Sequence, residues 1–227
     1  VLLSRVSELQ QKGQDREIGI LMLRTVRKLS AVYLPICAGA IVLGREFIVT
    51  LYTPQYLGSY PILAVNTLLL LMIAFTSDPV LRAYTNYRFV MLRIRCFMLA
   101  VLVALAIPGV HFFGMLGAIG AFVLSVTIER IILFALTMKI TGIRRSDWIY
   151  IKDVLKFASA AALMTLAGLL TRWALAGAPA QFILVAGALI MAVVYVSVVV
   201  TAGALEFDEK RAINSYLSRS LRFVLPA

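Results

Sequence analysis

Long apolar runs dominate the chain, and short polar stretches separate them. An α-helix needs about 20 predominantly apolar residues to cross the roughly 30 Å of hydrocarbon in a bilayer. Six runs have about that length, and they cover residues 29–51, 60–84, 90–107, 115–140, 154–175 and 182–205. The pattern predicts an all-α, polytopic membrane bundle of six transmembrane helices.

Prolines make the first and third runs irregular. Pro35 lies inside the first run, whose apolar part reaches only to Leu43. That part is too short to span a bilayer unless the helix tilts or includes Gly44, Arg45 and Glu46. The third run is expected to stop at Pro108-Gly109, because a proline removes a helical hydrogen bond and clashes with the preceding turn.

Polar segments flank the predicted bundle, which covers residues 29–205. Residues 1–28 have apolar positions at helical spacing and several bases, with Gly13 able to end one helix and Asp15 able to cap the next. They are predicted to be the end of a preceding span and an amphipathic linker on the cytoplasmic membrane surface. Residues 206–227 are predicted to be a cytoplasmic tail, either interfacial or solvated. Because the chain begins at Val1 without a signal peptide, we expect it to be a piece of a longer protein.

Basic residues are unevenly divided among the connections. The N-terminal segment and the tail each hold four or more, and so do the connections after the second and fourth runs when the adjoining run ends are included. Counted in the same way, the other connections hold only Arg45, His111 and Arg172. The positive-inside rule places the basic set in the cytoplasm. Six spans with both termini of the chain cytoplasmic satisfy every connection, which predicts a multi-pass protein of the cytoplasmic membrane. Headgroup anchoring is the favoured role for a predicted cytoplasmic basic cluster: Arg88, Arg93 and Arg95.

The second run is interrupted at residues 76–84 by an acid, a proline and a base. Pro79 cannot donate the helical hydrogen bond of its position, and it disfavours the helical conformation of Asp78. Asp followed by Pro is nevertheless a favoured start for a new helix. We therefore predict a kink or break near Asp78 that serves as a gate, with Pro79 setting the bend. Arg82, one turn later, is either the functional charge of this gate or a snorkelling partner of Asp78.

Glu129 and Arg130 place a second pair of charges inside the fourth run. A charged residue at membrane depth costs roughly 2.5–3.5 kcal/mol on insertion scales, so a functional role is the first hypothesis. Neighbouring side chains point about 100° apart on a helix, so the two charges cannot simply neutralise each other. At least one is expected to face a wet cavity or to pair with another span, and Arg130 with Asp78 is the candidate structural pair.

The formal net charge of +11 does not change this picture. A nucleic-acid binder needs a basic face on a soluble fold, whereas these bases lie between apolar runs, so no nucleic-acid partner is expected. Cys37 and Cys96 fit neither a disulfide framework nor a metal site. The sequence has no catalytic triad and no metal or cofactor motif, and the chain is not expected to be an enzyme.

Small residues at every fourth position of the fourth run predict close helix packing: Gly117, Ala121 and Ser125.

Five short segments stand out by their order along the chain. They are Leu3-Ser4-Arg5 with Gly13 and Asp15; Leu34-Pro35; Phe47-Ile48-Val49-Thr50-Leu51-Tyr52 with Tyr56; Leu81-Arg82-Ala83-Tyr84 with Arg88; and Ile107-Pro108 with Phe113-Gly114 and Leu116-Gly117-Ala118. In this order they resemble the C-terminal part of polysaccharide and oligosaccharide-lipid flippases, in the superfamily that includes the MATE drug exporters. The similarity covers roughly residues 1–145, and two further spans favour the polysaccharide branch.

The resemblance implies two helical bundles around a central cavity and transport by alternating access. This chain would hold most of the second bundle, and its partners would be the lipid bilayer and the missing N-terminal half. The implied substrate is a lipid-linked oligosaccharide with an anionic pyrophosphate, and no cofactor is implied. Guanidinium groups pair with phosphate bidentately, so Arg82 and Arg130 are the candidate substrate-binding residues. Asp78 and Glu129 are the candidate coupling or partner acids.

Two other functions stay open. A cation-coupled drug exporter of the MATE type would favour acids over bases in its cavity, with Arg82 and Arg130 facing lipid or helix contacts. A non-transporting scaffold subunit would pair all four intramembrane charges within a dry bundle. A membrane-embedded glycosyltransferase is disfavoured, because the connections are too short to hold a catalytic constellation.

Overall fold

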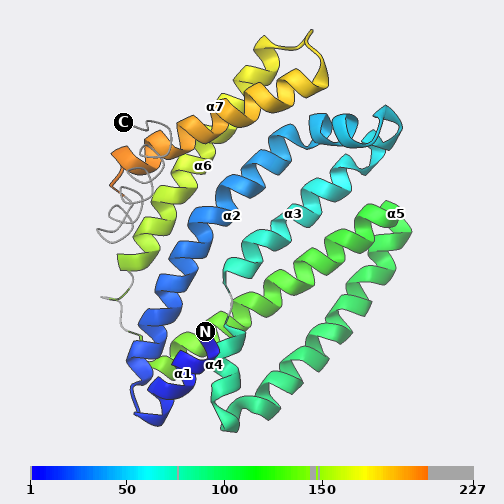
Figure 1. Cartoon of the computed structure of the whole chain (residues 1–227). Helices are drawn as coiled ribbons and strands as arrows, with labels where there is room; N and C mark the ends of the chain where they lie inside the picture. Colours follow the sequence, from blue (N-terminus) through cyan, green and yellow to red (C-terminus); the bar gives the residue numbers. More distant parts are fainter. Residues whose placement is uncertain (1, 76, 144–146, 148, 204–227) are drawn as a thin grey trace, which may run out of the picture.

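The computed structural model describes residues 2–75, 77–143, 147 and 149–203. These residues form helices joined by short turns, and five of the helices are long and apolar enough to cross a membrane. The prediction of an all-α fold is therefore confirmed, and these five helices have the length and apolar composition of membrane spans. In Figure 1 the long helices run side by side, and two short ones, α1 (Leu2–Gln11) and α4 (Asp78–Ala83), lie together at one end.

The central helix of the fold is α2 (Asp15–Leu51), which contacts every other long helix. Gly13, with φ +68°, lies between α1 and α2 as expected. Asp15 is the first residue of α2 and not its cap, because Gln14 occupies that position. Residues 15–28 and the predicted span that follows them belong to one helix, α2. The helix continues because Ile18, Met22 and Val26 carry one buried face directly into the bundle.

The predicted break in the second run is confirmed. A 3₁₀ helix, η1 (Pro54–Ser59), leads into α3 (Tyr60–Ala74), which ends before the proline, and α4 begins at Asp78. Ser77 takes the N-cap position, but its hydroxyl lies 3.9 Å from the sulfur of Met22 instead of capping the helix. Val80 and Leu81 are buried, so α4 is held against α1 and α2 on one side and α5 on the other.

The longest helical segment, α5 (Arg88–Thr141), folds back on itself. The reversal occurs at Gly114, with φ 57° and ψ −137°, and Figure 1 shows the two green arms lying side by side. The helix runs through Pro108, so the predicted end at Pro108-Gly109 is wrong. A proline costs the helix one hydrogen bond, but the reversal needs a positive φ, which glycine adopts without a Cβ clash.

Small residues let the two arms of α5 approach closely, as their spacing predicted. The backbones meet at Gly109 and Gly117, where a Cβ on Gly117 would collide with the carbonyl oxygen of Gly109. Further along, Ala121 and Ser125 are buried, and the Ser125 hydroxyl donates to the carbonyl of Met98 at 3.2 Å.

The last two helices, α6 (Ile149–Ala174) and α7 (Ala180–Thr201), form a hairpin against α2. Glycines allow its tightest contacts, since a Cβ on Gly168 would lie 2.5 Å from the sulfur of Met191, and one on Gly187 would lie 2.9 Å from Leu43. The tail predicted at residues 206–227 lies outside the described residues.

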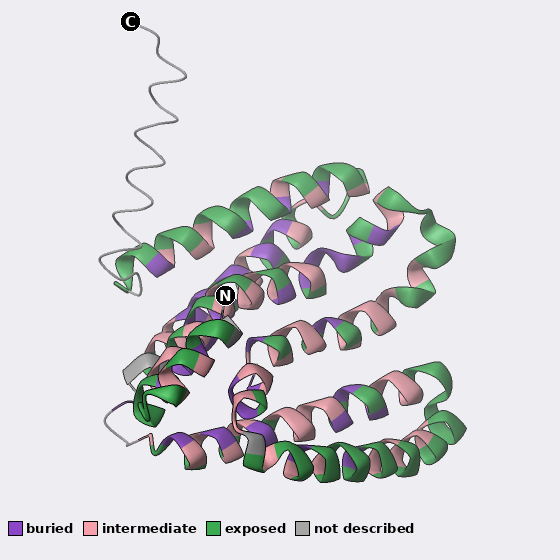
Figure 2. Ribbon diagram, turned by 60° about the horizontal axis from the view of Figure 1, so that its bottom comes forward, coloured by how far each residue is buried: buried purple, intermediate pink, exposed green. Residues whose placement is uncertain are grey.

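Exposed apolar side chains cover the outer faces of the bundle. Figure 2 shows that exposed residues dominate the first arm of α5 and the outer face of α7, while residues of intermediate burial dominate the second arm of α5. Phe97, Phe112 and Phe113 are each more than 60% exposed. Aromatic surface of this extent suits contact with hydrocarbon rather than with water.

Candidate functional site

The helix break brings an acid of α4 into contact with both arms of α5. Oδ1 of Asp78 accepts a hydrogen bond from Arg95 at 3.0 Å, and Oδ2 accepts one from Arg130 at 2.8 Å. Nε of Arg95 also lies 3.7 Å from Oε1 of Glu129. We call these four residues the Asp78 cluster: Asp78, Arg95, Glu129 and Arg130.

Helical spacing explains why these side chains meet. Arg95 lies four residues after Met91 and three before Met98, both of which are buried, so it belongs to the inner face of the first arm. Arg130 lies three residues before the fully buried Leu133 on the second arm. Asp78 is in the first turn of α4, where the helix dipole favours a negative charge.

The cluster is electrically balanced but not dry. Two carboxylates face two guanidinium groups, so the formal charges cancel. The side chains of Asp78, Glu129 and Arg130 are 20–24% exposed and that of Arg95 is 44% exposed. The cluster therefore ties α4 to both arms of α5 while its charges stay within reach of an ionic ligand.

Arg82 does not pair with Asp78, which was one of its two predicted roles. Both carboxylate oxygens of Asp78 are occupied by arginines of α5. Arg82 is exposed at the last turn of α4, and no ion pair with a described residue involves it. Within the part of the chain that the structure describes, its guanidinium group is thus a positive charge without an ion-pair partner, one turn from Asp78.

The predicted basic cluster divides into two kinds of residue. Arg88 and Arg93 are exposed, as expected for headgroup anchors, whereas Arg95 belongs to the Asp78 cluster. Sequence reasoning missed Arg95 because it grouped the three arginines by charge and not by helix face. The spacing Met91, Arg95, Met98 was the signal that could have found it.

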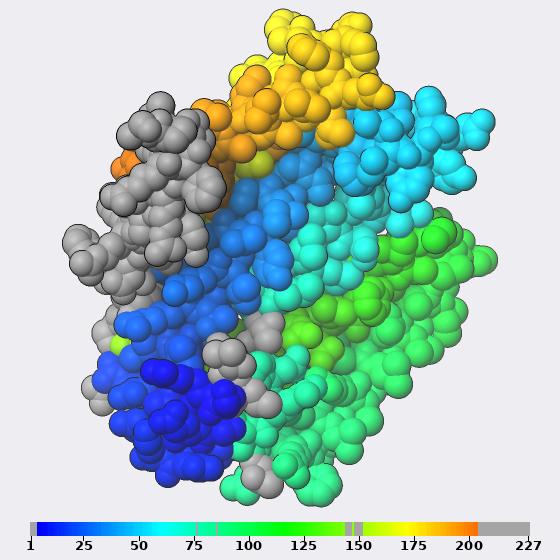
Figure 3. All heavy atoms as spheres, viewed as in Figure 1, coloured from blue at the N-terminus to red at the C-terminus, as the bar shows by residue number. Residues whose placement is uncertain are grey.

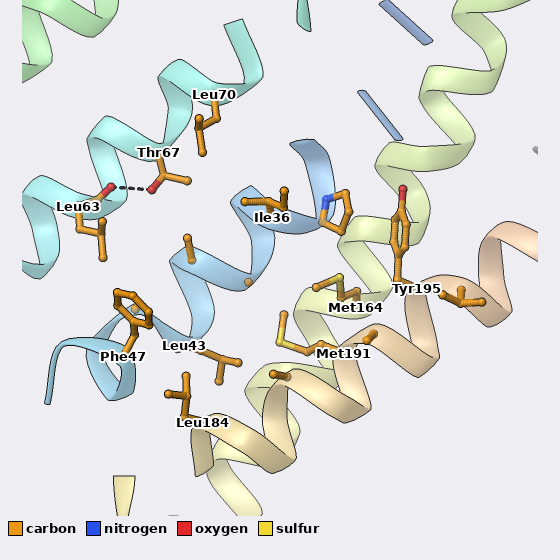
Figure 4. A pocket seen from close by; sticks show the side chains of 17 residues that line it. Ile36, Leu43, Phe47, Leu63, Thr67, Leu70, Met164, Leu184, Met191 and Tyr195 are labelled. Atoms are coloured by element: carbon orange, nitrogen blue, oxygen red, sulfur yellow. Dashed lines mark hydrogen bonds between the residues drawn. The ribbon is translucent and has the colours of Figure 1, made fainter. Parts of the chain in front are cut away.

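A long apolar groove lies along α2, between α3 on one side and α6 and α7 on the other. Its volume is about 620 Å³. Figure 4 shows its walls, which are almost entirely aliphatic, with sulfur and aromatic groups at intervals; the labelled side chains are Ile36, Leu43, Phe47, Leu63, Thr67, Leu70, Met164, Leu184, Met191 and Tyr195. The hydroxyl of Thr67 donates to the carbonyl of Leu63 at 2.8 Å, so it does not make the groove polar.

Pro35 and Tyr195, which both line this groove, form a specific pair. Pro35 has no backbone N–H, so the carbonyl of Ala31, four residues earlier, loses its usual helical donor. The hydroxyl of Tyr195 donates to this carbonyl at 2.6 Å. A side chain of α7 thus supplies the hydrogen bond that the proline removes from α2.

Polar contacts also join the helices at the end that contains α1 and α4. Arg16 pairs with Asp147 at 2.9 Å, and the buried Arg27 pairs with Asp153 at 3.0 Å and lies over the ring of Phe157. The Tyr84 hydroxyl donates to Asp15. Burial raises the pKa of that hydroxyl, and the neighbouring carboxylate adds to the effect, so it stays a donor at neutral pH.

Among the described residues, no group of three or more His, Cys, Asp or Glu is placed to hold a metal ion. No protein-family model, curated protein or solved structure matches the chain. A function must therefore be argued from the Asp78 cluster, Arg82 and the groove.

Proposed function

We propose that the chain is part of a flippase that moves a lipid-linked oligosaccharide across the cytoplasmic membrane by alternating access. The observation that carries the proposal is the partly exposed Asp78 cluster at a helix break, with the unpaired Arg82 beside it. A break that carries charge within a membrane helix is typical of a substrate or ion pathway.

The arrangement of helices is compatible with the second bundle of such a transporter. If each arm of α5 counts as one crossing, the described helices make six, the number that the apolar runs predict. The other bundle, which we propose to precede this chain, would supply the opposite wall of the cavity. The isolated chain is therefore expected not to transport.

The proposed substrate has two chemically different parts, and the chain offers a surface for each. A pyrophosphate suits arginine, whose planar guanidinium pairs with two phosphate oxygens at once. Arg82 would make the first contact, and Arg130 would follow when phosphate replaces Asp78 as its partner. Oδ2 of Asp78, freed from Arg130 in that exchange, could then bind a coupling cation together with Glu129, while Arg95 keeps its contacts with both acids. The apolar groove would accommodate hydrocarbon.

One observation favours a cation-coupled exporter of the MATE type as the second candidate. Arg130 contacts another helix through Asp78, which that function would favour, and the cluster also contains a second acid, Glu129. The scaffold hypothesis is less well supported, because it would pair Arg82 as well and keep all four charges dry.

The test is complementation with the full-length transporter in cells that lack their own flippase. Arg82→Ala and Arg130→Ala should each reduce surface polysaccharide at least several-fold while the amount of protein in the membrane stays unchanged. Lys139→Ala is the matched control. It also removes one positive charge, and Lys139 is exposed near the end of α5.

Normal export by both arginine variants would refute their assignment to the substrate. A loss of export that follows Asp78→Asn and Glu129→Gln but spares Arg82→Ala would favour the cation-coupled exporter, because only the acids are then needed.

A further inference from the structure

Two arginines lie at the end of the bundle opposite α1 and α4, where the chain has few basic residues. Arg45 and Arg172 are the only lysines or arginines at the helix ends and connections that the positive-inside rule places outside the cell. They are far apart in sequence, yet both line one pocket of about 200 Å³, together with Glu46. The pocket lies where α2 meets the hairpin of α6 and α7.

Glu46 fixes the orientation of Arg172. Its Oε1 lies 2.8 Å from Nε of Arg172, and its side chain is only 9% exposed. The second carboxylate oxygen is buried and has no hydrogen-bond partner among the described residues. That oxygen is an acceptor and would repel an anion, so anion binding in this pocket rests on the two guanidinium groups.

Arg45 supplies a positive charge that forms no ion pair among the described residues. It is exposed, its guanidinium lies 5.9 Å from the centre of the Tyr60 ring, and no ion pair with a described residue involves it. Glu46 compensates one of the two arginines, so the three side chains carry a formal charge of +1.

Aromatic residues place this pocket at the level of the lipid headgroups. Tyr52, Tyr56 and Trp173 are 64%, 57% and 81% exposed, and they lie in or beside η1 and the turn between α6 and α7. These two turns lie at the same end of the molecule in Figures 1 and 3. Exposed Tyr and Trp gather at the membrane–water interface, because their rings are apolar and their tips are polar.

We propose that Arg45, together with Arg172 as held by Glu46, binds the phosphate of an anionic phospholipid headgroup. A pocket with a charge of +1 complements a headgroup with a charge of −1, and it has less to gain from a zwitterionic headgroup. The planar guanidinium groups match the phosphate oxygens. Such a lipid would tie the α6–α7 hairpin to α2, whatever the chain transports, so the inference stands apart from the proposed function.

Trp173 provides the probe, because it follows Arg172 directly and is exposed. The chain carrying Trp148→Phe, which leaves Trp173 as its sole tryptophan, is reconstituted in vesicles that mix phosphatidylcholine with phosphatidylglycerol. Only one of the two lipids is brominated in each experiment. Brominated phosphatidylglycerol should quench Trp173 at a several-fold lower mole fraction than brominated phosphatidylcholine.

Arg45→Gln should reduce this preference to nearly one, because Arg45 provides the uncompensated charge. Lys139→Gln removes the same charge far from the pocket and should leave the preference unchanged. Equal quenching by both lipids in the unmodified pocket, or a preference that survives Arg45→Gln, would overturn the proposal. If inorganic phosphate at constant ionic strength abolishes the preference, the site takes free phosphate and the lipid assignment is wrong.

Discussion

Single side chains hold α4 in place at both of its ends. Asp78 joins its first turn to Arg95 and Arg130, and Tyr84, just after its last residue, donates to Asp15. A helix of six residues is too short to be stable alone in water, so its position depends on these contacts. A ligand that competes for Arg130 would therefore also loosen α4.

The contact between Gly109 and Gly117 makes a specific prediction for the α5 hairpin. Gly117→Ala would force a methyl group into the Gly109 carbonyl, so it should destabilise the protein by about 1–3 kcal/mol, as overpacking does. Gly120→Ala adds the same methyl group where no heavy atom lies within 4 Å. It should be neutral or slightly stabilising, because alanine is the better helix former by about 1 kcal/mol.

Thermal unfolding of both variants in detergent micelles measures the difference. If the two alanine variants had the same Tm, the arms of α5 would not approach each other at Gly117.

At the scale of helices, the link between α2 and α7 rests on Tyr195 and Pro35. Tyr195→Phe should cost about 1–2 kcal/mol, because it leaves the partly buried carbonyl of Ala31 without the donor that replaces the missing N–H of Pro35. In a Pro35→Ala background the same substitution should cost almost nothing, since residue 35 then has an N–H for that carbonyl. A double-mutant cycle of unfolding free energies gives the coupling between the two residues.

Tyr60→Phe is the control for this cycle. The Tyr60 hydroxyl also donates to a carbonyl of α2, that of Ile41 at 2.7 Å, but residue 45 still has the N–H that Ile41 needs within the helix. A similar loss of stability for Tyr60→Phe and Tyr195→Phe, with no coupling between Tyr195 and Pro35, would contradict the role assigned to the proline.

The positions of helix ends show what local sequence can predict. The break before Asp78 was predictable, because Pro79 acts on its own backbone and on its immediate neighbour. The reversal of α5 at Gly114 lies within the predicted connection between residues 107 and 115, but the end of the third run was placed too early, at Pro108-Gly109. A proline is tolerated within the helix there, whereas only the positive φ of Gly114 allows the chain to turn back. The continuation of α2 through residues 15–28 depends on burial against other helices, which no local signal contains.

At the scale of the whole molecule, the structure places η1 and the reversal of α5 at the end opposite α1 (Figure 1). Single cysteines test whether these ends lie on opposite sides of the membrane. In a background without Cys37 and Cys96, Tyr56→Cys and His111→Cys should react with an impermeant maleimide in intact cells, whereas Lys12→Cys should react only after permeabilisation. Labelling of all three in intact cells would refute the predicted topology.

Spans and charges could be predicted from the sequence, but the pairing of the charges could be predicted only in part. Arg130 with Asp78 was a candidate because both lie inside apolar runs and are opposite in charge. The roles of Arg95, Tyr195 and Glu46 depend on which helix faces which. Helix order in a bundle is set by packing between distant segments, such as Gly187 against Leu43, and a single sequence does not reveal it.

The fold of α5 has a consequence for how the protein enters the membrane during synthesis. Its two arms form one apolar hairpin of 54 residues, and His111 is the only titratable group near the turn. No lysine, arginine, aspartate or glutamate has to cross the hydrocarbon with this turn, so both arms can insert in one step. Arg95 and Glu129 lie on opposite arms, so that pair can form as the hairpin closes. Arg130 finds Asp78 on a segment that the ribosome has already released.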